Sequence, residues 1–96
     1  MGKRFVAMMA EEVTKEQRDA ITAFVKAKGF GFWHWVGNAW LLSTDAKEWT
    51  AEKLRDELRT LASGPLLLVL EVKGGTWSAF GTKGRFDWLH KNWKDE

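Results

Sequence analysis

The sequence predicts a single α+β domain built on an antiparallel sheet. Strand-like apolar runs alternate along the chain with two amphipathic helical segments, and a Gly-Asn pair separates two aromatic-rich runs. The third observation is size, because 96 residues, 45% of them hydrophobic and 29% charged, suffice for one core. We therefore expect one domain over residues 1–96.

An apolar run and a capped helix indicate the first strand and helix. Arg4 to Ala10 shows no helical periodicity and predicts a buried strand. Thr14 and Gln17 have the spacing of a capping box, in which both side chains satisfy free amides at a helix start. We expect this helix to reach Lys28, with Gly29 as its left-handed C-cap.

Residues Phe30 to Thr44 predict a β-hairpin. Gly37-Asn38 suits a two-residue turn with positive φ, and this turn would pair Val36 with Ala39. If the register continues without interruption, strand alternation defines two faces. One face would carry Trp33, Trp35, Trp40 and Leu42, and the other Phe32, His34, Val36 and Leu41. Both faces are largely apolar, which is unusual for a sheet with one side in water.

The second half of the chain predicts a helix, two strands and a tail. Thr50 is the expected N-cap of a helix over 51–62, which Ser63-Gly64-Pro65 ends. Leu66 to Lys73 is the most hydrophobic run and predicts a central or well-covered strand. Thr76 to Phe80 predicts a short extra strand, and Phe86 to Trp93 a short terminal helix.

The resulting order, β-α-β-β-α-β, is that of the ferredoxin-like sandwich, in which two helices cover one face of a four-stranded antiparallel sheet. We expect this fold with a short extra strand and a C-terminal helical tail.

The aromatic hairpin predicts an interaction surface. Because helices cover only one face of such a sheet, one apolar set would face outward, and exposed apolar patches mark interfaces. The predicted partner-binding residues are Trp33, Trp35, Trp40 and Leu42, packed sheet to sheet in a two-fold homodimer. One alternative is that residues 76–93 cover this face within the chain. Another is base stacking, although no stretch matches the RNP1 pattern.

The charge distribution leaves nucleic acid as an alternative partner. The net charge is +2, but residues 73–94 carry five basic side chains against Asp87 alone. Four of them are the predicted anion-binding residues: Lys83, Arg85, Lys91 and Lys94.

The sequence contains no catalytic or metal-binding motif. It has no cysteine, and His34 and His90 have no second ligand at a metal-binding spacing. Glu11-Glu12 could bind Mg²⁺ but equally fits a loop before a helix. We therefore predict a protein that is not an enzyme and needs no metal or cofactor. The absence of a secretory or membrane-spanning segment favours a cytoplasmic location, without membrane contact.

Three stretches resemble a small ferredoxin-like family that includes SinR-like proteins and the second subunit of the CRISPR integration complex. They are Arg4-Phe5-Val6-Ala7, residues 39–45 with the helix after Thr50, and Leu67-Leu68-Val69-Leu70-Glu71-Val72. This resemblance implies a homodimer with packed sheets, sometimes with nucleic-acid contact or metal-dependent nuclease activity. The family's metal-binding members carry an aromatic-Asp pair where this chain has Met8-Met9, so nuclease activity is not expected.

Together these observations predict a small non-enzymatic binding protein that forms a homodimer and engages another protein. Its small size and high tryptophan content also resemble accessory proteins of bacteriophages, which would make its partner a host protein. The alternative is a nucleic-acid-binding protein or a vestigial metal-dependent nuclease.

Overall fold

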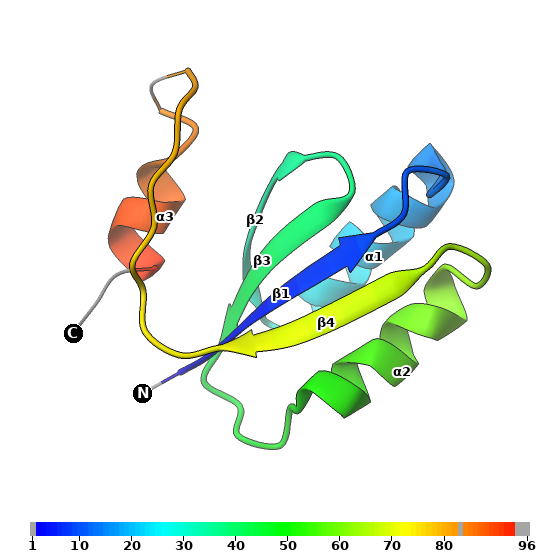
Figure 1. Cartoon of the computed structure of the whole chain (residues 1–96). Coiled ribbons are helices and arrows are strands. Elements are labelled where there is room, and N and C mark those ends of the chain that lie inside the picture. Colours follow the sequence, from blue (N-terminus) through cyan, green and yellow to red (C-terminus); the bar gives the residue numbers. More distant parts are fainter. Residues whose placement is uncertain (1, 83, 94–96) are drawn as a thin grey trace.

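A computed structural model of the chain describes residues 2–82 and 84–93. These residues form a four-stranded sheet, two long helices and one short helix (Figure 1). The elements in chain order are β1 (Lys3–Met9), α1 (Lys15–Ala27), β2 (Gly31–Val36), β3 (Ala39–Thr44), α2 (Ala51–Leu61), β4 (Leu67–Val72) and α3 (Asp87–Asn92).

The sheet is antiparallel throughout, with the strand order β2-β3-β1-β4. β3 therefore lies between β1 and β2, and β1 lies between β3 and β4. Helices α1 and α2 cover one face of the sheet, which we call the helix face (Figure 1). The predicted α+β class and antiparallel sheet are confirmed.

The hydrophobic core lies between the helix face and the two long helices. Alternate residues of the two central strands fill it from the sheet, and one buried stripe comes from each helix. Its largest fully buried side chains are Trp40, Phe5, Ile21, Leu42, Leu54, Leu58 and Val25. Trp49 closes the core beside α2, where its ring contacts Phe24 edge-on and Phe30 at a tilt.

The helix starts follow the predicted capping. The Gln17 amide donates to Thr14 Oγ1 over 3.1 Å, and the Thr14 amide donates to Gln17 Oε1 over 2.9 Å, which completes the capping box. At α2, the Lys53 amide donates to Thr50 Oγ1. Gly29, which follows the C-cap residue Lys28 of α1, has a φ of +80°, the left-handed conformation predicted for it.

Replacing Thr14 by Ala should lower the free energy of unfolding by about 1 kcal/mol, because the helix loses its N-cap acceptor. Urea denaturation followed by circular dichroism measures this change. The matched control is Thr60→Ala, at an exposed position inside α2, where the hydroxyl donates to the Glu57 carbonyl oxygen of the same helix. The better helix propensity of alanine offsets the loss of that bond, so stability should change by no more than about 0.5 kcal/mol. Equal losses in the two variants would contradict a capping role for Thr14.

Three local predictions are wrong. The hairpin turns at Gly37-Asn38, but neither residue has a positive φ. Residues 76–80 do not form the expected extra strand. The most apolar run, β4, is an edge strand rather than a central one, because it pairs only with β1 among the described residues. An apolar run alone does not distinguish these positions, since hydrophobicity reports burial of side chains and not the pairing of both strand edges.

Candidate interaction surface

The sheet has a second face that α1 and α2 do not cover, which we call the open face. Strand pairing places on it the residues that alternate with the core residues of each strand. Its apolar members are Val6 and Met8 of β1, Trp33 and Val36 of β2, Ala39 and Leu41 of β3, and Leu68, Leu70 and Val72 of β4. Several are well exposed: Met8 at 37%, Val36 at 49%, Leu68 at 49% and Leu70 at 45%.

A β-bulge in β2 decides which aromatic side chains reach the open face. Val36 pairs with Ala39 as predicted, but Trp33 pairs with Leu41 instead of Leu42, so β2 has one extra residue between these pairs. The extra residue moves Trp33 to the open face, together with Leu41. A bulge also increases local strand twist, which a positive-φ turn would otherwise supply.

The predicted face of Trp33, Trp35, Trp40 and Leu42 is therefore wrong as a set. Trp40 and Leu42 are fully buried on the helix face, where the His34 ring stacks on Trp40 with centroids 4.1 Å apart. Trp33 is half-buried, and Trp35 remains 57% exposed. Only the two tryptophans of β2 thus belong to the candidate surface.

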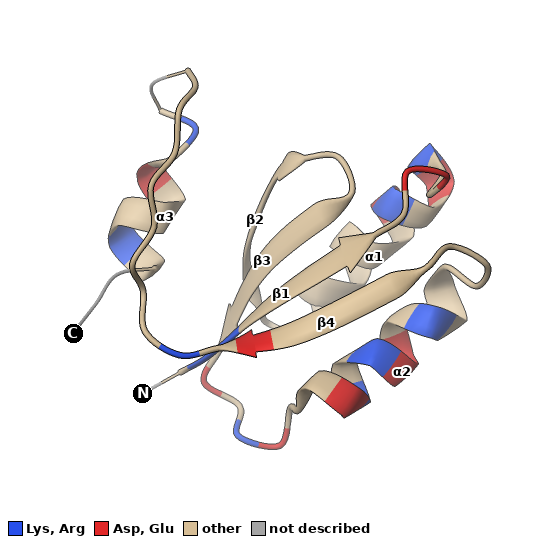
Figure 2. Cartoon of the chain, viewed as in Figure 1, with Lys and Arg blue, Asp and Glu red and all other residues tan. Residues whose placement is uncertain are grey.

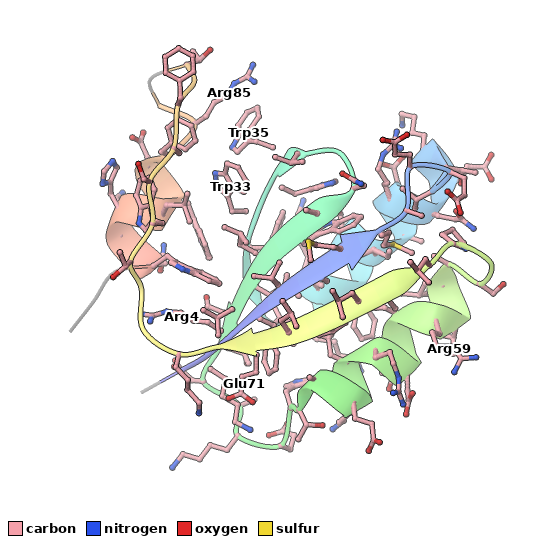
Figure 3. The ribbon with its side chains drawn as sticks, in the orientation of Figure 1. Arg4, Trp33, Trp35, Arg59, Glu71 and Arg85 are labelled. Atoms are coloured by element: carbon pink, nitrogen blue, oxygen red, sulfur yellow. The ribbon has the colours of Figure 1, made fainter. Side chains whose placement is uncertain are left out.

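The C-terminal segment covers the part of the open face that lies along β2. Trp33 Nε1 donates to the Arg85 carbonyl oxygen over 2.6 Å, and the Trp33 ring stacks on Phe86 with centroids 6.1 Å apart. The Arg85 guanidinium lies 4.7 Å from the centre of the Trp35 ring, as a cation–π contact. Figure 3 shows both tryptophans directed toward the segment that carries Arg85.

A second attachment fixes the end of this segment. Leu89 and Trp93 are buried, and the Arg4 guanidinium lies 5.8 Å from the centre of the Trp93 ring. The Arg4 side chain also donates to the Gly74 carbonyl, so it contacts both the residue that follows α3 and the start of the connection between β4 and α3. The sequence left open the alternative that residues 76–93 cover the hairpin within one chain, and the structure shows this cover over β2. Met8, Leu68 and Leu70 stay exposed.

The predicted anion-binding residues do not form one described cluster. Lys83 and Lys94 lie outside the described residues. Arg85 is engaged with Trp35, and Lys91 is exposed on α3. The charged residues of the strands lie at one end of the sheet, where β1 begins and β4 ends, and the middle of the sheet is uncharged (Figure 2). The open face therefore presents an apolar centre instead of a basic one.

The histidines and acidic residues of the described part of the chain do not gather into a metal site. Residues 2–82 and 84–93 contain no group of three or more His, Asp or Glu placed to hold a metal ion. His34 Nε2 is 3.0 Å from the Gly37 carbonyl oxygen, and the His90 ring lies against Trp77. Both histidines thus have structural contacts.

Among residues 2–82 and 84–93, the two perturbed pKa values belong to exposed helix residues. A hydrogen bond from Lys15 lowers the pKa of Asp19 on α1, and a hydrogen bond to Asp56 raises the pKa of Arg55 on α2. Lys15 and Asp19 form an i,i+4 ion pair of 2.8 Å, an ordinary helix-surface interaction. Neither shift indicates an acid or base prepared for catalysis.

Met8, Leu68 and Leu70 are the interaction candidates that the sequence analysis missed. Their signal was present, because Val6-Ala7-Met8-Met9 and Leu67 to Leu70 are apolar on both faces of their strands. The tryptophans of the hairpin predicted an interaction surface on β2 and β3 instead. The strand pairing moves its centre to β1 and β4.

Comparison with protein-family profiles, with curated proteins and with solved structures gives no match to this chain. The resemblance to the SinR-like and CRISPR-associated family therefore stays a prediction. Among the described helices, none is long and apolar enough to cross a membrane.

Proposed function

We propose that the protein is a small non-catalytic binding domain that acts as a homodimer and engages a protein partner through its open face. The observation that carries this proposal is the apolar centre of that face, where Met8, Leu68 and Leu70 are exposed side by side across β1 and β4. The centres of protein interfaces are depleted in charge and enriched in methionine and aromatic residues. Trp35 and Arg85 at the margin of the face add two residue types typical of binding hot spots.

The proposed architecture is the ferredoxin-like form of the α+β class. The split arrangement supports it, because a strand of each βαβ unit lies between the two strands of the other. One face of such a sheet remains free of the two long helices, which is what a binding role needs.

Nucleic-acid binding and vestigial nuclease activity stay predictions. No feature of the described residues favours either of them over protein binding. A nucleic-acid site is expected to gather lysine and arginine on one face. The only charged side chain on the described strands of the open face is Arg4, which contacts Trp93 and Gly74. A cytoplasmic location also belongs to the proposal, and the lack of cysteine supports it.

Selection from a displayed library of random peptides tests the role of the open face. Peptides rich in apolar and aromatic residues should be enriched on the wild-type protein. Their affinity should fall at least about tenfold in Met8→Glu and in Val36→Glu, which place a charge on the apolar face.

The matched control is Ala23→Glu, which makes the same charge change on the exposed side of α1. It should bind the selected peptides as the wild type does. Failure to enrich any peptide, or binding that survives both open-face variants, would overturn the proposed role of the face.

A further inference from the structure

The two edges of the sheet differ in how they are protected against pairing with another strand. The β2 edge has a bulge, and the segment around Arg85 and Trp88 lies against it. β4 forms the other edge. Its inner side pairs with β1 without interruption, from Met9–Leu67 to Arg4–Val72. Within the described residues, no other strand pairs with its outer side, and α2 runs beside it on the helix face (Figure 1). Proline, charged side chains and bulges are the usual devices that protect an edge, and of these β4 has only one charged residue, Glu71 near its end.

The register identifies the backbone groups of β4 that face outward. The Ala10 amide donates to the Leu66 carbonyl oxygen over 2.9 Å, in line with the β1–β4 register. Since backbone groups alternate sides along a strand, Leu68 and Leu70 also direct theirs toward β1. The amides and carbonyls of Leu67, Val69 and Glu71 therefore point to the free edge.

We propose that a second copy of the chain pairs along this edge, β4 against β4, antiparallel about a two-fold axis through Val69. In this register Val69 faces Val69 of the partner subunit, and Leu67 faces Glu71 of the partner subunit. Every outward-facing residue of β4 then belongs to a hydrogen-bonded pair, which gives about six main-chain hydrogen bonds. The two four-stranded sheets join into one continuous sheet.

Side chains on both faces fit this arrangement. On the open face Leu68 comes beside Leu70 of the partner subunit, and both are about half exposed in the single chain. They form non-hydrogen-bonded pairs, in which side chains approach most closely. On the helix face the two α2 helices lie on either side of the axis. Each has three acidic and three basic residues, so their net charges do not repel.

This inference rests on the homodimer proposed above and specifies its interface. It differs from stacking of two sheet faces, since the open faces of both copies remain free and lie side by side. The surface available to a protein partner is then twice as wide.

Replacing Val69 by Pro tests the edge directly. Proline removes an amide that faces the free edge, so the β1–β4 hydrogen bonds remain. The wild type should sediment as a dimer, and Val69→Pro should raise its dissociation constant about 100-fold through the two lost central hydrogen bonds and the clash of the rings. The control Val69→Ala, which loses side-chain packing on the core but keeps the amide, should stay dimeric.

Three outcomes separate the possibilities. A Val69→Pro protein as dimeric as Val69→Ala overturns the edge interface. A dimer that dissociates in Met8→Glu but persists in Val69→Pro also overturns it and leaves the homodimer standing on the open face. A monomeric wild type overturns both the edge and the homodimer, whereas peptide binding to the open face is measured separately.

Hydrogen exchange provides a second test that needs no variant, in case Val69→Pro does not fold. In wild-type protein the amides of Leu67, Val69 and Glu71 should exchange more slowly as the protein concentration rises. The amide of Leu70 bonds within the chain and serves as the internal control. Exchange of the three edge amides that does not depend on concentration would overturn the inference.

Discussion

Trp40→Ala is expected to lower the free energy of unfolding by about 3–5 kcal/mol, the range for removing a large aromatic side chain from a core. Trp40 is fully buried between the sheet and α1, its ring stacks on His34, and its Nε1 donates to Thr22 Oγ1 over 3.3 Å. The variant loses the packing of the indole and leaves a cavity beside Thr22. Denaturation in urea, followed by circular dichroism, measures the loss.

Trp35→Ala is the matched control, because it makes the same substitution one strand away at a position that is 57% exposed. It should cost less than about 1 kcal/mol. Similar losses in the two variants would contradict the strand register, which places these two tryptophans in different environments. That result would favour the sequence prediction in which Trp35 and Trp40 lie on the same face of the hairpin.

Trp93→Ala is expected to cost about 3 kcal/mol and to release the C-terminal segment from the sheet. Trp93 is buried, and its ring contacts Arg4 and Trp88. In the variant Trp33 should become more exposed, because the segment that carries its acceptor, the Arg85 carbonyl, is no longer fixed at its end. Limited proteolysis should then cut faster between residues 73 and 86.

Phe80→Ala provides the control for this prediction. Phe80 lies in the same connection but is fully exposed, so its removal should change stability by no more than about 0.5 kcal/mol. Unchanged proteolysis in Trp93→Ala would show that Trp33 and Arg85 hold the segment without the terminal attachment.

Local signals in the sequence predicted the elements well. Thr14 and Gln17 marked the start of α1, Gly29 its end and Thr50 the start of α2, and the structure confirms each of them. These signals depend on residues only a few positions apart, where side chains satisfy neighbouring backbone groups. The sequence also predicted that the hairpin turns at Gly37-Asn38.

The candidate surface was harder to predict because it depends on two non-local properties. One extra residue between Trp33 and Val36 reverses the side on which Trp33 lies, and an alternation counted from the turn does not detect it. The position of β4 at an edge follows from its pairing with β1, more than fifty residues away in the chain. Leu68 and Leu70 were therefore assigned to a covered strand although they are exposed.

The strand order has a consequence for the synthesis of the chain. Of the four strands of the sheet, β1 leaves the ribosome before the others, but it lies between β3 and β4, which follow it by some thirty and some sixty residues. Its backbone groups on the β4 side stay unpaired until Val72 has been made. Contacts between distant segments also slow folding, since the intervening loop must close first. Of these four strands, the one made first is thus among the last to be paired on both sides.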